Sequence, residues 1–313
     1  KMMSARLQDA AHLKIPVIDF SSYDPEHPEG LRELSLQVNQ ALSEVGFMGV
    51  RSIGISQELR RRAFSISRNF FAQTAQEKQQ LGYGSAADNF GYQGIGEEKL
   101  APDAPPDLKE AITLRDVLAR TDGRWADTEL QSFVEEFYRE CLAAAHRLQR
   151  VFAAALDLDS EFFVQHHSGE NVTMRMLHYP PLQVQEASQL GAGEHTDYGM
   201  LTLLFQDQQG GLEVQGADGH WIGVEPDDEI VVVNTGDLTE RWTNGYYRST
   251  SHRVQPRSNG EHRYSIAFFV DPDSSTTVSC LPSCVDEKHP LQFEPVNAGE
   301  HILSKLEATQ RDQ

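Results

Sequence analysis

The sequence predicts an α+β, mainly β fold with a double-stranded β-helix (jelly-roll) core, an N-terminal helical region and a long supporting helix. Two observations predict this class. The first half of the chain carries apolar residues at helical spacing, and the second half consists of short β-rich segments separated by turn signals. Seven or eight short strands at such spacing favour two packed sheets that can enclose a small-molecule or metal site. We expect a single globular domain at 1–313, with the N-terminal region of helices and short strands at 14–130 and the jelly-roll core at 170–275.

The N-terminal half combines helices with a few short strands. Its expected elements are a strand at 15–20, a helix at 30–45, a strand at 47–50, a helix from the N-cap Ser56 to about residue 81, and a long loop at 82–107 with a short strand near 90–93. The most regular helical pattern lies at 127–158, where apolar residues recur at steps of three and four. A helix of that length can support a whole sheet.

The second half predicts the strands of the core. They are expected at 173–179, 201–205, 211–215, 221–224, 229–234, 249–254 and 263–270. Asp218-Gly219 stands between two of them and is a strong hairpin signal, because glycine adopts the positive φ angle that a tight turn needs.

Composition restricts the partners of the protein. The chain carries a formal net charge of −20, which repels nucleic-acid phosphates and anionic lipid head groups. Its longest apolar run, Val151 to Leu156, is far shorter than the roughly 18 residues of a membrane span. We therefore expect a small-molecule substrate, no nucleic-acid or membrane partner, and a monomer or weak homodimer.

Two features bear on the compartment. The three cysteines, Cys141, Cys280 and Cys284, include no CxxC pair and fit a reducing environment better than a disulfide framework. Residues 1–13 lack the apolar segment and cleavage site of a secretory signal. A cytoplasmic location is expected.

A candidate metal site begins at His195-Thr196-Asp197, where two ligand types at i and i+2 share one side of an extended segment. Such a pair alone is weak evidence, because about one is expected by chance in a chain with 12 histidines. His252 lies inside a predicted strand and supplies a third ligand. Two histidines and a carboxylate form a facial triad that leaves positions open on iron(II), whereas a structural zinc site has four closed ligands.

Arg263 and Ser265 form a second pair at i and i+2 on a predicted strand. The planar guanidinium can bind a carboxylate through two parallel hydrogen bonds, and the hydroxyl adds a third donor. The pair therefore suits the far carboxylate of a dicarboxylic acid. On its own the pair favours the plainer interpretation, an arginine paired with a surface carboxylate on an edge strand.

These residues stand within a longer pattern that resembles the isopenicillin N synthase-like branch of the iron(II)/2-oxoglutarate-dependent dioxygenases. The resemblance covers about residues 14–275. The segments that carry it include Ile15–Phe20 (IPVIDF), Asp107–Glu110 (DLKE), Tyr179-Pro180-Pro181, Glu194–Phe205 (EHTDYGMLTLLF), Asn234–Asp237 (NTGD), Arg248–Val254 (RSTSHRV) and Arg263–Pro272.

The resemblance implies specific ligands. Fe(2+) would be bound by His195, Asp197 and His252, and 2-oxoglutarate and O2 would be the co-substrates. Arg263 and Ser265 would hold the far carboxylate of 2-oxoglutarate, with Tyr179 donating a hydrogen bond nearby. One position departs from the pattern, because Leu177 stands where many members have an asparagine, so any hydrogen bond from that amide to the co-substrate is lost.

Strand parity extends the site toward the substrate. If Tyr179 points into the core, Leu177 and Arg175 point inward as well, and Phe269 shares the face of Arg263. An inward arginine needs an anionic partner. That partner is either an acid of the protein or an acidic group of the substrate, and the second option predicts a small, acidic or amino-acid-like metabolite.

The expected activity is oxidation of an unactivated C–H bond by hydroxylation, desaturation, oxidative cyclisation or demethylation, with release of succinate and CO2. Two alternatives stay open. One is a keto-acid-free oxidase of the same fold that uses Arg263 and Ser265 for the carboxylate of its substrate. The other is a catalytically silent jelly-roll binding module.

Overall fold

Two sheets enclose the centre of the computed structural model, which describes residues 14–309 except 102, 104, 126, 182–190 and 256–259. In this part of the chain the larger sheet has eight strands in the order β1-β2-β10-β7-β12-β5-β4-β3, and the smaller has four in the order β6-β11-β8-β9. All pairings within both sheets are antiparallel except that of β1 with β2. The jelly-roll core and the mainly β class are therefore confirmed.

The strands are β1 (Val17–Asp19), β2 (Phe47–Arg51), β3 (Gly91–Gln93), β4 (Glu110–Arg115), β5 (Val172–Tyr179), β6 (Ala192–His195), β7 (Leu201–Gln206), β8 (Leu212–Gln215), β9 (Trp221–Gly223), β10 (Val231–Thr235), β11 (His252–Val254), β12 (Arg263–Val270), β13 (Thr277–Val278) and β14 (Val296–Asn297). The α-helices are α1 (Pro28–Glu44), α2 (Gln57–Phe71), α3 (Ala75–Gln79), α4 (Thr128–Ala155), α5 (Asp237–Trp242) and α6 (Ala298–Ala308). The segment 1–13, expected to lack a secretory signal, lies outside the described residues.

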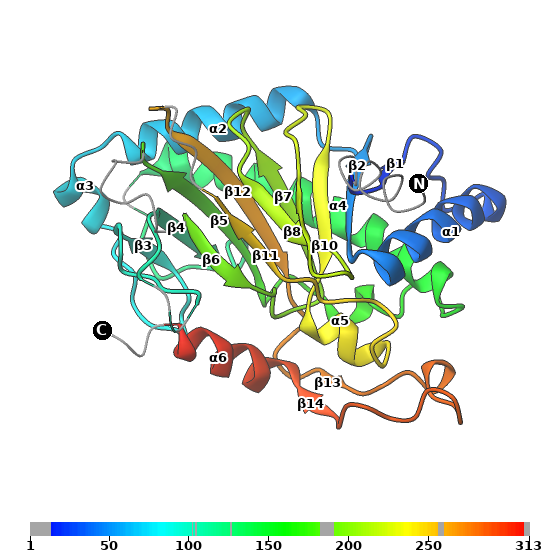
Figure 1. Cartoon of the computed structure of the whole chain (residues 1–313). Coiled ribbons are helices and arrows are strands. Elements are labelled where there is room, and N and C mark those ends of the chain that lie inside the picture. The colour runs from blue at the N-terminus through cyan, green and yellow to red at the C-terminus, as the bar shows by residue number, and fades with distance from the viewer. Residues whose placement is uncertain are drawn as a thin grey trace, which may run out of the picture.

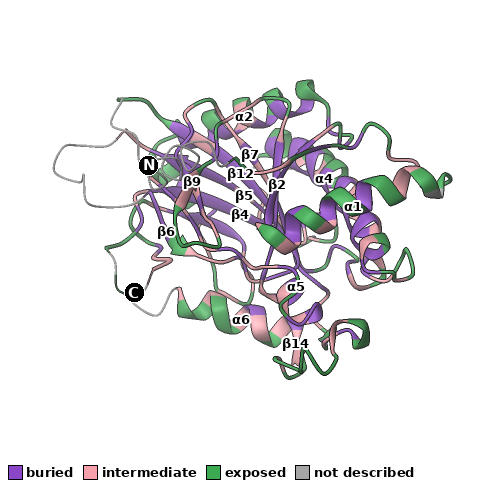
Figure 2. Ribbon diagram, turned by 45° about the vertical axis from the view of Figure 1, so that its right-hand side comes forward, coloured by how far each residue is buried: buried purple, intermediate pink, exposed green. Residues whose placement is uncertain are grey.

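Helices α2 and α4 cover one face of the larger sheet, where both contact β12 (Figure 1). Successive side chains of β12 point to alternate faces of this sheet. Ile266, Phe268 and Val270 are fully buried beneath the helices, in the main hydrophobic core. Arg263 and Ser265 have the other parity in the same strand and point to the opposite face, toward the smaller sheet. Figure 2 shows the same division, with buried strands inside and helices exposed on their outer sides.

Among the described residues, the apolar clusters that lie between the two sheets are small. One of them joins Leu177 and Tyr179 of the larger sheet to Ala192 and Val254 of the smaller sheet. Because these clusters do not fill the interior, room is left for polar side chains. This is the region in which the sequence places its candidate site.

Several expected boundaries were wrong. The single helix expected up to residue 81 is divided into α2 and α3, because Thr74 forms a capping box with Glu77 and starts a new helix. The strand expected at 249–254 is shorter and begins at His252. Strands β4 and β6 and helices α5 and α6 were not expected. Segments of four to six residues carry too little periodicity, and α6 lies beyond the predicted jelly-roll core at 170–275.

Other expectations were confirmed. Ser56 caps α2 by accepting a hydrogen bond from the Leu59 backbone. The turn at Asp218-Gly219 joins the antiparallel strands β8 and β9, with Gly219 at a φ of 82°. The long supporting helix expected at 127–158 is α4, which runs from Thr128 to Ala155. None of the described helices combines the length and the apolar character that crossing a bilayer requires.

Candidate active site

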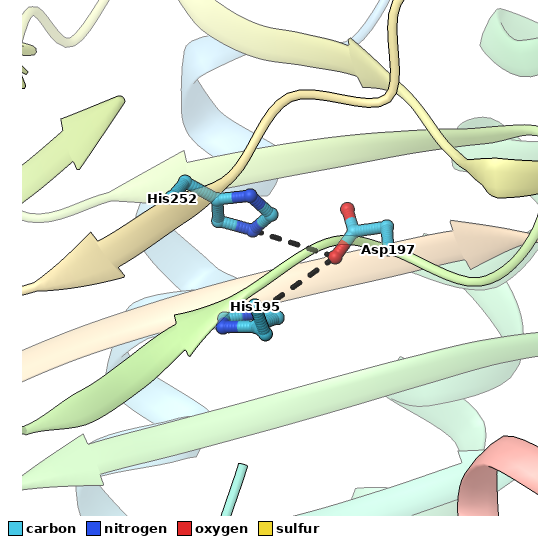
Figure 3. A group of neighbouring side chains, drawn as sticks. All are labelled: His195, Asp197 and His252. Carbon is cyan, nitrogen blue, oxygen red and sulfur yellow. Dashed lines mark ion pairs between the residues drawn. The ribbon is translucent and has the colours of Figure 1, made fainter. Parts of the chain in front are cut away.

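Three potential metal ligands meet on the smaller sheet. His195 ends β6 and lies directly opposite His252 on β11, and Asp197 follows two residues after His195. Asp197 Oδ1 lies 3.4 Å from His252 Nε2 and 3.9 Å from His195 Nε2 (Figure 3). One ligand atom from each residue lies within 4.8 Å of the others. This spacing fits three ligands around one ion.

Hydrogen bonds from the surrounding backbone orient both imidazoles. His195 Nδ1 donates to the Gly193 carbonyl at 2.7 Å, and His252 Nδ1 donates to the Thr250 carbonyl at 3.0 Å. Since a carbonyl can only accept, each Nδ1 carries a proton, so the neutral form of each ring has its lone pair on Nε2. In that form both lone pairs are available to a metal.

The carboxylate of Asp197 is oriented in the same way. Its Oδ2 accepts from Thr202 Oγ1 at 2.6 Å and from Asn234 Nδ2 at 2.7 Å. These two donors come from β7 and β10 of the larger sheet. They occupy one oxygen and leave Oδ1 facing the two histidines, as outer hydrogen bonds commonly do around metal sites.

Burial and mutual charge set the protonation of the three groups. Burial lowers the pKa of His195 to about 3, and repulsion from His252 acts in the same direction. Burial also opposes the charged form of His252, but attraction to Asp197 raises its pKa overall. Burial would raise the pKa of Asp197, yet the charge of His252 and its hydrogen bond lower it. The carboxylate is thus ionised and the His195 ring is neutral, as metal ligation requires.

The cavity next to these ligands, called here the Arg263 cavity, is lined by Arg263, Ser265 and Tyr179 as well as by all three potential ligands. Arg263 lies opposite Tyr179 in the β12–β5 register, and its guanidinium carbon is 4.7 Å from the centre of the Tyr179 ring. Arg263 Nε donates to the Gly210 carbonyl at 2.7 Å. The buried Nη1 has no hydrogen-bond partner among the described residues. Nη2 donates to Gln206 Oε1 at 3.3 Å, so Nη1 is the guanidinium nitrogen that is left for a carboxylate ligand at the cavity wall.

A second cavity, called here the Glu98 cavity, shares His195, Asp197, Arg175 and Phe269 with the first. Leu177 lines only the Arg263 cavity of the two. The parity expected from the sequence is confirmed, because Arg175, Leu177 and Tyr179 all face the interior.

Arg175 already has an acidic partner. Its Nη1 and Nη2 donate to the two carboxylate oxygens of Glu98 at 3.2 and 2.5 Å, and its Nε donates to Thr113 Oγ1 at 3.1 Å. Burial opposes the charge of Glu98, but Arg175 and Lys109 lower the pKa of its carboxyl group. Of the two partners that the sequence left open for Arg175, the structure contains the acid of the protein.

Sequence reasoning missed several residues of these cavities. Glu98 and Lys109 lie in or next to the long loop, which has no periodicity to indicate its direction. Asp271 could have been found, because it continues the inward face of β12 two residues after Phe269. Burial raises the pKa of Asp271 to about 7, and repulsion from Asp197 adds to the rise. Ile302 of α6 comes from a part of the chain that carried no motif.

The arrangement matches the chemistry of an open iron site. When both imidazoles are in the neutral form that binds metal, they and one carboxylate leave other coordination positions free for a chelating co-substrate and O2. The two cavities meet at these ligands, since His195 and Asp197 line both. The described residues therefore fit iron(II) and 2-oxoglutarate.

Comparisons with known proteins agree with this chemistry. Residues 15–134 match the model of the non-haem dioxygenase N-terminal region, and residues 164–272 match that of the 2OG-Fe(II) oxygenase superfamily. A 2-oxoglutarate-Fe(II) type oxidoreductase of Aspergillus fumigatus is 31% identical over 94% of this chain and 93% of its own length. A similar oxidoreductase of Emericella nidulans is 32% identical over 92% of this chain and 88% of its own.

Solved structures show the same relationship. A full-length Neurospora crassa protein in complex with α-KG and thymine is 30% identical, with a TM-score of 0.86 over 94% of this chain and 97% of that chain. The rice dioxygenase for auxin oxidation is 26% identical, with a TM-score of 0.76 over 95% and 99% of the two chains. The chain therefore belongs to the iron(II)/2-oxoglutarate-dependent oxygenases and is a 2-oxoglutarate-dependent dioxygenase.

Proposed function

We propose that this enzyme oxidises an unactivated C–H bond of a small polar metabolite and converts 2-oxoglutarate to succinate and CO2. The observation that carries the proposal is the shared wall of the two cavities. His195 and Asp197 line both, so a substrate in the Glu98 cavity and a co-substrate in the Arg263 cavity meet at the same ligands. Neither cavity alone would bring the two molecules together.

Each residue has a proposed role. His195, Asp197 and His252 hold iron(II) through two Nε2 atoms and Asp197 Oδ1. Arg263, Ser265 and Tyr179 bind the far carboxylate of 2-oxoglutarate, which the unpartnered Nη1 of Arg263 supports. When bound, iron(II) and the keto acid supply the activation of O2 by oxidative decarboxylation. The protein orients both molecules and limits the access of stray water to a site whose ligands are largely buried.

The partner of Arg175 modifies the expected substrate. The sequence predicted an acidic or amino-acid-like molecule, because a lone buried arginine needs an anion. Glu98 supplies that anion, so the pair presents one positive and one negative group to the cavity. Such a pair favours a substrate without net charge, either a zwitterion of the amino-acid type or a neutral molecule with donors and acceptors. The thymine complex of the Neurospora crassa protein is consistent with the neutral option.

The remaining wall of the Glu98 cavity fits a small ring or chain. Phe269 offers an apolar surface on the face that also carries Arg263, and Leu177 adds apolar surface in the neighbouring Arg263 cavity. We propose that Arg175 and Phe269 contact the substrate, and that Leu177, which lines only the Arg263 cavity, contacts the co-substrate instead. Polar recognition of the substrate then comes from Arg175, and Phe269 positions the carbon that reacts.

The decisive experiment measures succinate release by the iron-loaded enzyme with panels of neutral heterocycles, amino acids and organic acids. We expect release to depend on added 2-oxoglutarate and to rise with a neutral or zwitterionic compound, whose oxidised product is identified by mass spectrometry. Oxidation of a substrate without added 2-oxoglutarate would indicate the keto-acid-free oxidase. Compound binding without any turnover would indicate the binding module.

Two substitutions test the substrate class. Arg175→Met keeps the length and removes the charge, so the Michaelis constant for substrate should rise while that for 2-oxoglutarate stays the same. Glu98→Gln is the matched variant, because it leaves the positive charge of Arg175 unpaired. It should shift preference toward anionic analogues. Unchanged substrate kinetics in both variants would refute the role of this pair.

A further inference from the structure

A buried lysine lines the Arg263 cavity in addition to the residues assigned above. The side chain of Lys109 is 2% exposed. Lys109 precedes Ala111 by two residues, and Ala111 lies opposite Leu177 in the β4–β5 register. By the alternation of extended chain, Lys109 therefore lies on the same face as Tyr179 and Leu177.

The acidic neighbours of Lys109 do not use all of its hydrogen-bonding capacity. Among the described residues, its ammonium donates one hydrogen bond, to Asp107 Oδ2 at 2.8 Å. Glu98 Oε1 is 3.6 Å away, which is too far for a hydrogen bond. Since an ammonium has three N–H donors, two remain for a group in the cavity.

Asp107 and Glu98 also have other partners. Asp107 accepts from the backbone N–H groups of Gly193 and Leu100 at 3.0 and 3.2 Å. Glu98 is held by both terminal nitrogens of Arg175. Neither carboxylate therefore depends on Lys109 alone. A purely structural role leaves unexplained why the lysine reaches the cavity wall.

Lys109 is positively charged. Burial acts to lower its pKa, but Glu98 and Asp107 raise that pKa above the usual value for lysine. Its charge is also close enough to His195 to add to the lowering of the pKa of that ring, after burial and His252. A fixed positive charge thus stands near one of the proposed iron ligands.

The co-substrate needs such a charge at that end. Arg263, Ser265 and Tyr179 account for one of the two carboxylates of 2-oxoglutarate. Further along β12 the inward residues are Ala267 and Phe269, which donate no side-chain hydrogen bond, and Leu177 on β5 donates none either. Arg175 lies opposite Ala267, but its charge is neutralised by Glu98. Lys109 is the lining cation whose donors are largely unused among the described residues.

We infer that Lys109 donates a hydrogen bond to the iron-chelating carboxylate of 2-oxoglutarate, at the end opposite Arg263. The inference deepens the proposed function and depends on the co-substrate binding in the Arg263 cavity. Lys109 would thus supply to the co-substrate the hydrogen bond that the apolar side chain of Leu177 cannot donate. A carboxylate so held is fixed in direction before O2 binds.

The test measures binding rather than turnover. Calorimetry is done on the manganese-loaded protein, with 2-oxoglutarate and with pyruvate, which keeps the oxo-carboxylate end and lacks the far carboxylate. Lys109→Met should weaken both ligands by the same factor, about 10- to 100-fold for a lost hydrogen bond to a charged group. Arg263→Met should weaken 2-oxoglutarate and leave pyruvate unchanged, which identifies the two ends.

Asp107→Asn is the matched control, because it removes the partner of Lys109 and keeps the ammonium. If Lys109 only supports the loop through Asp107, this variant will lose as much affinity as Lys109→Met, and the inference is overturned. A loss confined to 2-oxoglutarate, with pyruvate binding intact, also overturns it. Failure of the native protein to bind 2-oxoglutarate overturns the proposed function as well.

Two double variants complete the test. Leu177→Asn added to Lys109→Met places an amide donor on the same face and should restore part of the pyruvate affinity, which a structural defect would not allow. Should Lys109→Met fail to fold, Asp107→Asn with Lys109→Met removes the stranded carboxylate and carries the same comparison. If this double variant binds pyruvate as tightly as the single variant Asp107→Asn does, the inference is contradicted.

Discussion

The hydroxyl of Thr202 is predicted to set the metal affinity although it is not a ligand. Thr202→Val replaces it by a methyl group of similar size, so packing in β7 is retained. The change removes the 2.6 Å hydrogen bond to Asp197 Oδ2 and leaves the 2.7 Å bond from Asn234. Asp197 Oδ1 is then held less firmly toward His195 and His252.

The magnitude follows from the two donors. A hydrogen bond to a charged group contributes about 1.5–3 kcal/mol, and loss of an outer partner of a metal ligand commonly costs about 10- to 100-fold in metal affinity. Because Asn234 still bonds the same oxygen, we expect a rise in the dissociation constant near the lower limit, about 10-fold. Thr202→Val with Asn234→Leu should lose more than either single change, but not additively, since both act on one atom.

In the assay, the metal-free protein is titrated anaerobically with iron(II) or manganese(II), and calorimetry measures the dissociation constant of the metal. Thr202→Ser is the control, because it restores the hydroxyl and should bind metal like the native protein. Circular dichroism confirms that all variants are folded. An affinity of Thr202→Val within twofold of the native value would refute the view that this hydrogen bond orients Asp197.

Three further predictions concern the ligands, the co-substrate and pH. Replacement of His195, Asp197 or His252 by alanine should abolish turnover and iron retention while the far-ultraviolet spectrum is unchanged; stoichiometric iron with full activity in any of them would contradict the ligand assignment. Arg263→Lys keeps the charge and loses the planar fork, so the Michaelis constant for 2-oxoglutarate should rise about tenfold or more, and an unchanged constant would argue against carboxylate binding by Arg263. Burial lowers the pKa of His167 to about 3, so the unfolded chain binds the proton that the folded protein excludes. The contribution of His167 to the free energy of unfolding is therefore retained above about pH 6.5 and falls by about 2 kcal/mol at pH 5. Urea unfolding measured between these pH values should show a smaller loss of stability in His167→Gln than in the native protein.

The sequence was sufficient to identify the potential metal ligands and the inward faces of the core strands. Both depend on local alternation: His195 and Asp197 share a side because they are two residues apart, and Arg263 and Ser265 share a side for the same reason. Alternation also predicted that Arg175 faces the interior, which the structure confirms. The jelly-roll class followed from the number and spacing of short strands.

Short elements and irregular segments were beyond this kind of reasoning. Strand β6, which carries His195, has four residues, too few for a periodic signal. The break between α2 and α3 depends on the capping box at Thr74, because these local hydrogen bonds start a new helix where the sequence pattern would also allow the first helix to continue. Helix α6 supplies Ile302 to the Glu98 cavity, although α6 lies far along the chain from the other lining residues and no sequence pattern links it to them.

Charge pairing was decided only by the tertiary structure. The sequence determined that Arg175 points inward, and it left open whether a protein acid or a substrate acid meets it. Glu98 lies 77 residues away in a loop, and only the folded chain brings it to Arg175, together with Lys109 and Asp107. Strand alternation is a property of neighbouring residues, so the sequence contains it. A contact between a loop and a strand depends on the path of the whole chain, and that path decides which charges remain free to meet a ligand.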